Sequence, residues 1–180
     1  GTGLIPVMRI FTELGFQSVV TVAEQEKPDG DFPTLRVPNP ECEDTFDKAV
    51  EYAKLSMADI IIATDPDSDR LGVVLPDMHG EYTILTGNQI GILLMEYTLA
   101  LKSARGTLPQ NGFCAVSLVS GRLARSICRR YGISLYETPT GSKYIAELIK
   151  SLDDNGTERF VMGFEEGNGY LLGTDVREKD

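Results

Sequence analysis

Residues 59–75 read DIIIATDPDSDRLGVVL, and this stretch decides how the first half of the chain folds. Apolar, mostly β-branched residues stand on both sides of a charged centre, which predicts strands at residues 59–63 and 71–75 joined by a loop. The loop carries Asp65, Asp67 and Asp69 at alternate positions, and Arg70 follows at once. Because alternate residues of an extended segment point to one side, the three carboxylates are expected to converge.

Three converging carboxylates repel one another, and a divalent cation would relieve the conflict. Ligands that are all oxygen favour Mg²⁺, Mn²⁺ or Ca²⁺ over Zn²⁺. A calcium-binding EF-hand loop starting at Asp65 would need glycine at its sixth position and glutamate at its twelfth, where the chain has Arg70 and Pro76. We therefore expect Mg²⁺ on Asp65, Asp67 and Asp69. Arg70 would lie at the rim of the metal, able to make a forked contact to a phosphate. A solvated acidic turn is the alternative.

The composition of the 180-residue chain is that of a water-soluble globular protein, with 42% hydrophobic residues, 24% charged residues and a formal net charge of −10. Surfaces that bind nucleic acid or anionic membranes need clustered Lys and Arg, so neither kind of partner is expected. No apolar run approaches the ~18 residues of a membrane span, and no signal peptide opens the chain. Three separated cysteines and one histidine argue against a disulfide framework, a zinc site or a Ser-His-Asp triad. They favour reduced thiols in a cytoplasmic protein.

Helical and strand patterns alternate along the chain, which predicts the α/β class with largely parallel sheets. Further helices are expected at residues 6–14, 45–56, 88–101, 120–131 and 144–152, and further strands at 17–22, 81–85, 113–119, 133–137, 160–163 and 170–172. Asn88 is expected to cap the helix that it begins, and residues 27–41, with four prolines, are expected to form an ordered loop. We expect two consecutive α/β units with mostly parallel mixed sheets flanked by helices, at residues 1–86 and 87–180.

Two further loops follow predicted strands of the second unit, at the sheet edge where α/β proteins usually bind ligands. In the first, TPTGSKYI at residues 138–145, the Thr140 hydroxyl, the Gly141 backbone and Lys143 could hold a polar ligand. An ordinary capped turn is the alternative reading of this loop.

The second loop, GFEEGNGYLLG at residues 163–173, places Glu165 and Glu166 among four glycines. Carboxylates there suit the hydroxyls of a sugar, since each accepts several hydrogen bonds; a glycine-rich hairpin with a solvated tip is the alternative. Near the end of the chain, Lys179 could supply positive charge for a phosphate, although such charged tails are usually solvated. Together with the acidic loop, these features suggest a metal site, a phosphate-binding site and a sugar-binding site.

Seven motifs occur in the order that is typical of the α-D-phosphohexomutases: GTG, PDGDFPTLRVPNPE, ATDPDSDRLGV, LTGNQIG, TPTGSKYI, GFEEGNGYLLG and REKD. The chain resembles this family, which includes phosphoglucomutase and phosphomannomutase, nearly from end to end. The resemblance implies a four-domain enzyme in which a phosphoserine on the first domain donates its phosphoryl group to a sugar monophosphate. The resulting bisphosphate reorients and returns the other phosphoryl group.

The resemblance also implies a role for each candidate residue. The metal ligands would be Asp65, Asp67 and Asp69 on Mg²⁺, and Arg70 would steady the transferring phosphoryl group. The sugar site would contain Thr140, Gly141 and Glu165, and Lys179 would touch the substrate phosphate.

The chain departs from the family pattern in four respects. The serine loop, usually Ser-His-Asn-Pro, and the C-terminal phosphate-binding domain are both absent from these 180 residues. Gly167 stands where the sugar loop usually has serine, and Ser142 stands where a large aromatic is common. The chain therefore looks like part of the second domain and most of the third.

Three hypotheses follow. In the first, the chain is a fragment of a cytoplasmic phosphoglucomutase or phosphomannomutase that interconverts hexose 1-phosphate and 6-phosphate. Glucose phosphates would be its substrates, with mannose phosphates as the alternative. It would need the missing domains of the same polypeptide and would be inactive alone. In the second, it is a module that binds a sugar phosphate or a partner without catalysis. The third is a Mg²⁺-dependent phosphatase with Asp65 as its nucleophile.

Overall fold

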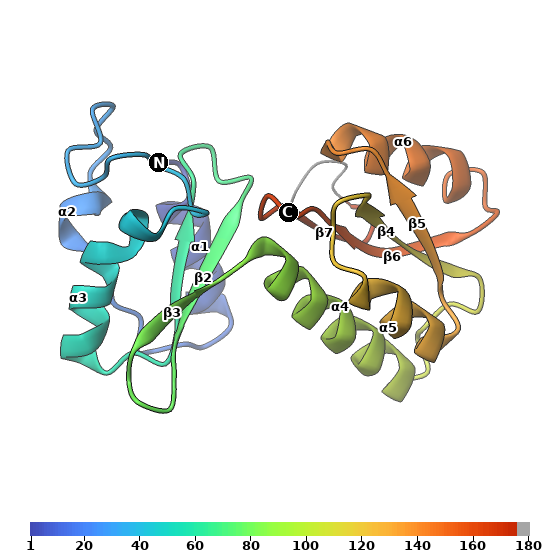
Figure 1. The fold of residues 1–180 in the computed structure, drawn as a ribbon, viewed down its shortest axis with the longest axis horizontal. Coiled ribbons are helices and arrows are strands. Elements are labelled where there is room, and N and C mark those ends of the chain that lie inside the picture. Colours follow the sequence, from blue (N-terminus) through green and yellow to red (C-terminus); the bar gives the residue numbers. More distant parts are fainter. Residues whose placement is uncertain (176–180) are drawn as a thin grey trace. The chain divides into compact units, whose positions relative to one another are not determined.

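The computed structural model describes residues 1–175, and the chain divides into two compact units, Gly1–Leu85 and Thr86–Asp180. The first unit contains α1 (Leu4–Glu13), α2 (Ala23–Glu26), a short 3₁₀ helix η1 (Glu43–Phe46), α3 (Asp47–Ser56), β1 (Ile61–Thr64), β2 (Leu71–Pro76) and β3 (Tyr82–Leu85) (Figure 1). The second contains α4 (Gly87–Ala104), β4 (Gly112–Ser117), α5 (Leu123–Tyr131), β5 (Ser134–Thr138), α6 (Ser142–Leu152), β6 (Arg159–Phe164) and β7 (Tyr170–Leu172). The predicted α/β class, with sheets flanked by helices, is confirmed, and the sheet of the second unit is mixed.

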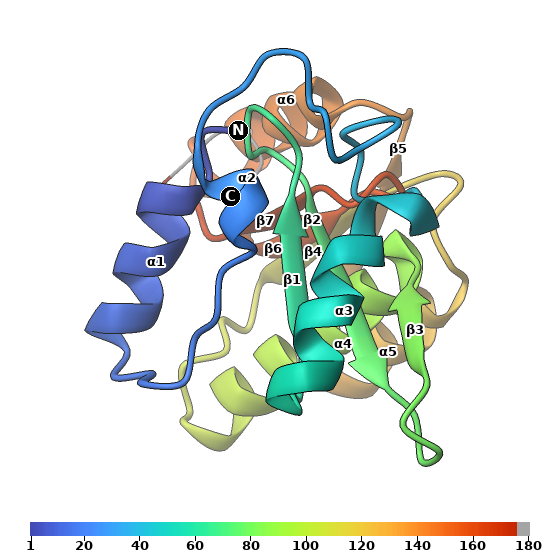
Figure 2. The same ribbon diagram turned by 90° about the vertical axis from the view of Figure 1, so that its left-hand side faces the viewer.

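The sheet of the first unit has the order β1-β2-β3, and its described strands all pair antiparallel. The expectation of a largely parallel sheet is wrong for this unit. Only residues 65–70 and 77–81 connect its strands, whereas a parallel pair needs a crossover of a dozen residues or more. Helix α3 lies across one face of the sheet (Figure 2), where Phe46 and Ala53 pack on Ile61 and Val74.

The strand expected at residues 17–22 does not form. Within the part of the chain that the structure describes, β1 pairs only with β2, and no ladder partner reaches this segment. Its β-branched residues give it strand propensity, but propensity without a neighbouring strand does not make a sheet. Helix α1, which precedes it, has no buried residue.

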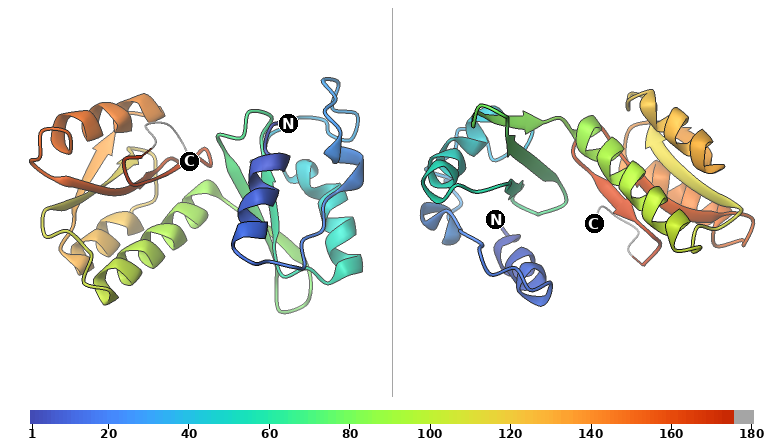
Figure 3. Two further views of the ribbon diagram at one scale, coloured as in Figure 1. Left: turned by 180° about the vertical axis from the view of Figure 1, so that it is seen from behind. Right: turned by 90° about the horizontal axis from the view of Figure 1, so that it is seen from below.

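The sheet of the second unit has the order β5-β4-β6-β7, in which β4 pairs parallel with both β5 and β6, and β7 pairs antiparallel with β6. Helices cover both faces of this sheet (Figure 3). On one face, Ile145 and Ile149 of α6 pack on Phe113 and Phe160. On the other, Gly91 of α4 lies against the ring of Phe164.

A register shift in β6 determines which side chains face which helix. Phe113 of β4 pairs with Phe160, but the next residue pairs with Met162, so Val161 is an extra residue in the ladder. Such a bulge moves every later side chain to the opposite face of its strand. Phe164 consequently faces α4, and the residue after it is directed toward the α6 face.

The start of α4 differs in one detail from expectation. Thr86, and not Asn88, is the N-cap: the Thr86 hydroxyl accepts the Gln89 N–H, while the Gln89 side chain accepts the Thr86 N–H at 2.8 Å. This reciprocal capping box satisfies two backbone donors and takes precedence over a single asparagine cap. Asn88 is thereby left to bind a neighbouring loop through its side chain.

Candidate functional site

The three aspartates of the acidic loop come together. One carboxylate oxygen from each of Asp65, Asp67 and Asp69 lies within 4.8 Å of the others. Asp65 is buried, with 2% of its surface exposed, while Asp67 is exposed. Ser68 turns the loop with a left-handed φ of 65°, and its N–H donates to the Asp65 carbonyl. An oxygen-only donor set with one buried carboxylate and one exposed carboxylate fits Mg²⁺.

Arg70 binds the buried carboxylate directly. Its backbone N–H donates to Oδ1 of Asp65 at 3.1 Å, and its Nε donates to Oδ2 at 2.8 Å. On the far side, Nη1 of Arg70 lies 3.4 Å from Oδ1 of Asn39 and 3.2 Å from Oε1 of Glu41. Burial by itself would raise the pKa of Asp65, but the hydrogen bonds from Arg70 outweigh it, and the pKa is lowered. Asp65 is therefore an anion at neutral pH.

The first three residues of the chain support the acidic loop from behind. The Thr2 N–H donates to the carbonyl of Pro66 at 2.8 Å, and its hydroxyl lies 3.1 Å from that of Ser68. Gly3 is so close that a Cβ there would lie 2.4 Å from the Thr64 hydroxyl oxygen. Reasoning from the sequence missed this role, although two glycines flanking a threonine were a signal of close backbone approach.

In the second unit, Glu165 joins the two loops that the sequence singled out. Its side chain is buried and accepts the N–H of Gly141, which immediately precedes α6, while its own N–H donates to the carbonyl of Gly169 at 2.9 Å. Gly141 has a φ of 125°, a conformation that favours glycine. Thr140 is exposed at the same turn. The structure thus brings Gly141 and Glu165 into contact at the ends of β5 and β6, and Thr140 precedes Gly141 in the chain.

Lys143 takes no part in this contact. The ammonium of Lys143 is exposed and lies 4.8 Å from the centre of the Tyr144 ring on its own helix, a cation–π contact. Lys179 lies outside the residues that the structure describes.

Sequence reasoning missed a polar group that ties the β6–β7 turn to the end of β4. The Ser117 hydroxyl donates to the Glu166 carboxylate and lies 2.8 Å from the Ser120 hydroxyl. The Asn88 side chain accepts the N–H of Gly121, just beyond that serine, at 3.1 Å. The glutamate next to the predicted sugar ligand therefore has a structural partner on another strand.

The start of α4 lies directly under the same turn. A Cβ at Gly87 would lie 2.1 Å from the carbonyl oxygen of Glu166 and 2.8 Å from the backbone nitrogen of Asn168. The Tyr170 hydroxyl donates to the Gly87 carbonyl. Glycine is required here because any side chain would displace the turn that carries Glu165.

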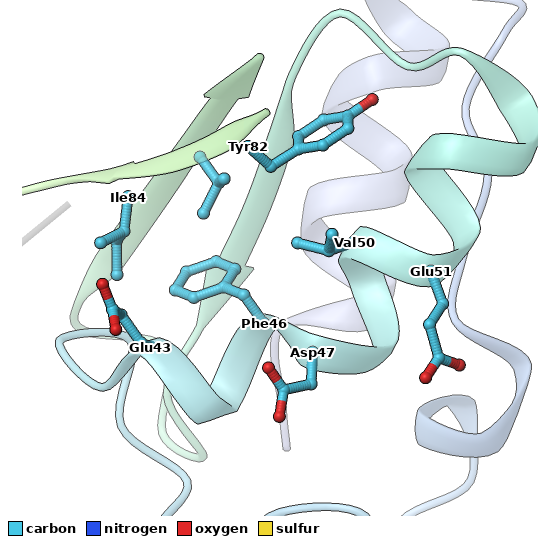
Figure 4. Close-up of a pocket in the computed structure, with 8 residues that line it drawn as sticks. Glu43, Phe46, Asp47, Val50, Glu51, Tyr82 and Ile84 are labelled. Carbon is cyan, nitrogen blue, oxygen red and sulfur yellow. The ribbon is translucent and has the colours of Figure 1, made fainter. Parts of the chain in front are cut away.

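A shallow pocket of about 480 Å³ lies elsewhere in the first unit, between α3 and the sheet (Figure 4). Phe46, Val50 and Ile84 give it an apolar floor, and Glu43 and Asp47 stand at its rim. None of the residues that line it belongs to the acidic loop. In the described part of the chain, no cationic side chain lines it that could bind a phosphate, so the acidic loop remains the candidate site of the first unit.

Comparison with known families assigns both units. Residues 1–80 match the family described as Phosphoglucomutase/phosphomannomutase, alpha/beta/alpha domain II. Residues 86–180 match Phosphoglucomutase/phosphomannomutase, alpha/beta/alpha domain III. The chain belongs to the phosphoglucomutase/phosphomannomutase family.

Individual relatives agree with this assignment. The phosphoglucomutase of Staphylococcus epidermidis is 41% identical over all 180 residues, and that of Staphylococcus aureus is 39% identical. The chain spans 32% of the length of each. Among solved structures, a phosphoglucomutase/phosphomannomutase family protein from Burkholderia thailandensis superposes with a TM-score of 0.65 at 20% identity, over 84% of this chain and 29% of the other. In the part of this chain that the structure describes, no helix has the length and apolarity needed to cross a membrane.

Proposed function

We propose that the chain is the metal-binding and sugar-binding part of a cytoplasmic phosphohexomutase, most simply a phosphoglucomutase. The whole enzyme would interconvert hexose 1-phosphate and 6-phosphate. The observation that carries the proposal is the convergence of Asp65, Asp67 and Asp69 beside Arg70 in a chain of this family.

The acidic loop would hold Mg²⁺ through its three aspartates. When bound, the ion would neutralise negative charge on the phosphoryl group, which is the main requirement of phosphoryl transfer. Arg70 would place a second positive charge beside the same group, and its planar guanidinium suits the oxygens of a phosphate. Asp65 binds Arg70 through two hydrogen bonds. The same loop would therefore place both positive charges, that of the ion and that of the arginine, beside the phosphoryl group.

The second unit would hold the sugar. Glu165 would accept hydrogen bonds from sugar hydroxyls with the oxygen capacity left by Gly141, and Thr140 would contribute its hydroxyl from the exposed turn. Lys143 and Lys179 would supply positive charge to the substrate phosphate. Gly167 stands where the family usually has serine, so this set lacks one hydroxyl group. The missing hydroxyl would change the sugar specificity of the site.

The phosphoryl donor would be a phosphoserine on another part of the same polypeptide. Phosphopeptide mapping of the full polypeptide from its source cells should therefore find a phosphoserine outside residues 1–180, and that polypeptide should interconvert glucose 1-phosphate and glucose 6-phosphate with Mg²⁺. The isolated chain should show no turnover. Mutase activity of the pure chain with added hexose bisphosphate would contradict the proposal, and a native polypeptide without phosphoserine or activity would favour a binding module instead.

A further inference from the structure

Residues 27–41 form a loop with four prolines, and the proposed function gives this loop no task. We propose that Glu41, together with Asn39, is a positioning residue that aims the guanidinium of Arg70. The inference rests on the proposed function only in the group that Arg70 would contact; the aiming itself is a property of the first unit.

The contacts fix the guanidinium from two sides. Its Nε lies 2.8 Å from Asp65, on the acidic loop, while its Nη1 lies 3.2 Å from Glu41 and 3.4 Å from Asn39. The guanidinium is planar and rigid, so contacts at two of its nitrogens define its orientation as well as its position. With Asp65 alone, Arg70 could still turn about its final side-chain bonds.

Hydrogen bonds order the backbone of the loop that carries Glu41. The Thr45 side chain is buried, and its hydroxyl lies 3.0 Å and 2.8 Å from the carbonyl oxygens of Val37 and Asn39. The Asn39 side chain also accepts the N–H of Glu41 at 3.0 Å, and the Asn39 carbonyl accepts the N–H of Cys42. The side chain of Glu41 therefore projects from an ordered backbone, which a positioning contact requires.

Direct packing sets the distance between this loop and the strand that follows Arg70. Pro40 is buried against Gly72 of β2: a Cβ on Gly72 would lie 2.7 Å from Cβ of Pro40 and 2.8 Å from its carbonyl oxygen. Gly72 is two residues from Arg70, and Pro40 is adjacent to Glu41. The two partners of the ion pair thus come from backbone segments in van der Waals contact.

Kinetics separate aiming from a general structural role. In the full polypeptide, Glu41→Ala should lower kcat about tenfold with KM within about twofold, because a misdirected guanidinium weakens contacts made in the transition state. Glu41→Gln keeps an acceptor for Nη1 and should lose less. Glu43→Ala removes an exposed carboxylate two residues further on and should leave both constants within about twofold. Equal kcat in Glu41→Ala and the wild type would overturn the inference.

A second measurement does not depend on activity. In the ¹⁵N spectrum of the 180-residue chain, the Nε–Hε signal of Arg70, assigned by its loss in Arg70→Lys, should broaden or shift in Glu41→Ala and stay in place in Glu43→Ala. An unchanged signal in Glu41→Ala overturns the inference even if kcat falls. If the wild-type polypeptide shows no mutase activity, the proposed function fails, and this spectrum still decides whether Glu41 aims Arg70.

Discussion

The two units build their candidate sites in different ways. In the first, the proposed metal ligands and Arg70 lie within one loop of six residues between paired strands β1 and β2. In the second, Glu165 meets Gly141 across a separation of 24 residues, at the ends of two strands that flank β4. The candidate ligands of the first site therefore come from one local stretch of sequence, whereas topology brings those of the second together. We therefore expect the loss of a single charged side chain to disrupt the first site. Substitutions that displace a loop should disrupt the second.

The largest effect is expected from Asp67→Asn in the full polypeptide. Asp67 is exposed, so its substitution removes a proposed ligand without disturbing the core. Mutase activity should fall by about 100-fold or more, since charge neutralisation by the metal dominates phosphoryl transfer. Activity is measured at saturating Mg²⁺ with Asp31→Asn, another exposed aspartate, as the matched control. Activity within about twofold of the wild type would show that the acidic loop is a solvated turn.

The second prediction tests whether the two sites are separable. Glu165→Ala leaves the Gly141 N–H without its partner and removes the proposed acceptor for sugar hydroxyls. We expect KM for hexose phosphate to rise about tenfold to 100-fold, because a lost hydrogen bond to a charged group is worth roughly 1.5–3 kcal/mol. Mg²⁺ affinity, measured by calorimetry, should stay unchanged. A parallel loss of Mg²⁺ affinity would contradict the separation of the sites.

These two predictions rest on features that the sequence made visible to different degrees. The acidic loop could be predicted because its spacing is local and Arg70 is adjacent. The ends of β5 and β6 were also predictable, but the contact of Glu165 with Gly141 was not, because the extra residue Val161 sets the face toward which Glu165 points. Such a bulge depends on strand pairing and leaves no sequence pattern.

The errors of sequence reasoning have different causes. The strand expected at residues 17–22 was inferred from β-branched residues alone, and strand propensity carries little weight without a partner. The antiparallel first sheet was foreseeable from its short connections. The supporting contacts of Thr2 and Glu41 were not, because they join segments more than 25 residues apart.

A third prediction concerns the packing that holds the second site in place. A Cβ at Gly91 would lie 2.3 Å from the ring of Phe164, the residue before Glu165. Gly91→Ala should therefore lower the free energy of unfolding by about 1–3 kcal/mol, the usual cost of overpacking. Urea unfolding of the chain measures it, and Gly30→Ala, which would meet no atom within 4 Å, is the control. Equal losses in both variants would contradict the close approach of α4 and β6.

The smallest effect is expected in the pH dependence of the first unit without metal. The folded pKa of Asp65 lies below its ordinary value of 3.8, so its ion pair stabilises the fold above about pH 4 and is lost as the pH falls further. With EDTA present, the difference in free energy of unfolding between wild type and Asp65→Asn should shrink as the pH falls from about 5 to about 3, because Asp65 begins to take up a proton in this range. A difference that stays constant would show that Arg70 does not depend on the charge of Asp65.

The central claim, that the acidic loop is a Mg²⁺ site, is tested most directly by calorimetric titration of the 180-residue chain with Mg²⁺. The account predicts saturable binding of one ion per chain in the wild type and its loss in Asp65→Asn, with the folded content of the variant checked by circular dichroism. Absence of saturable binding, or binding that is equal in a folded Asp65→Asn variant, would contradict it.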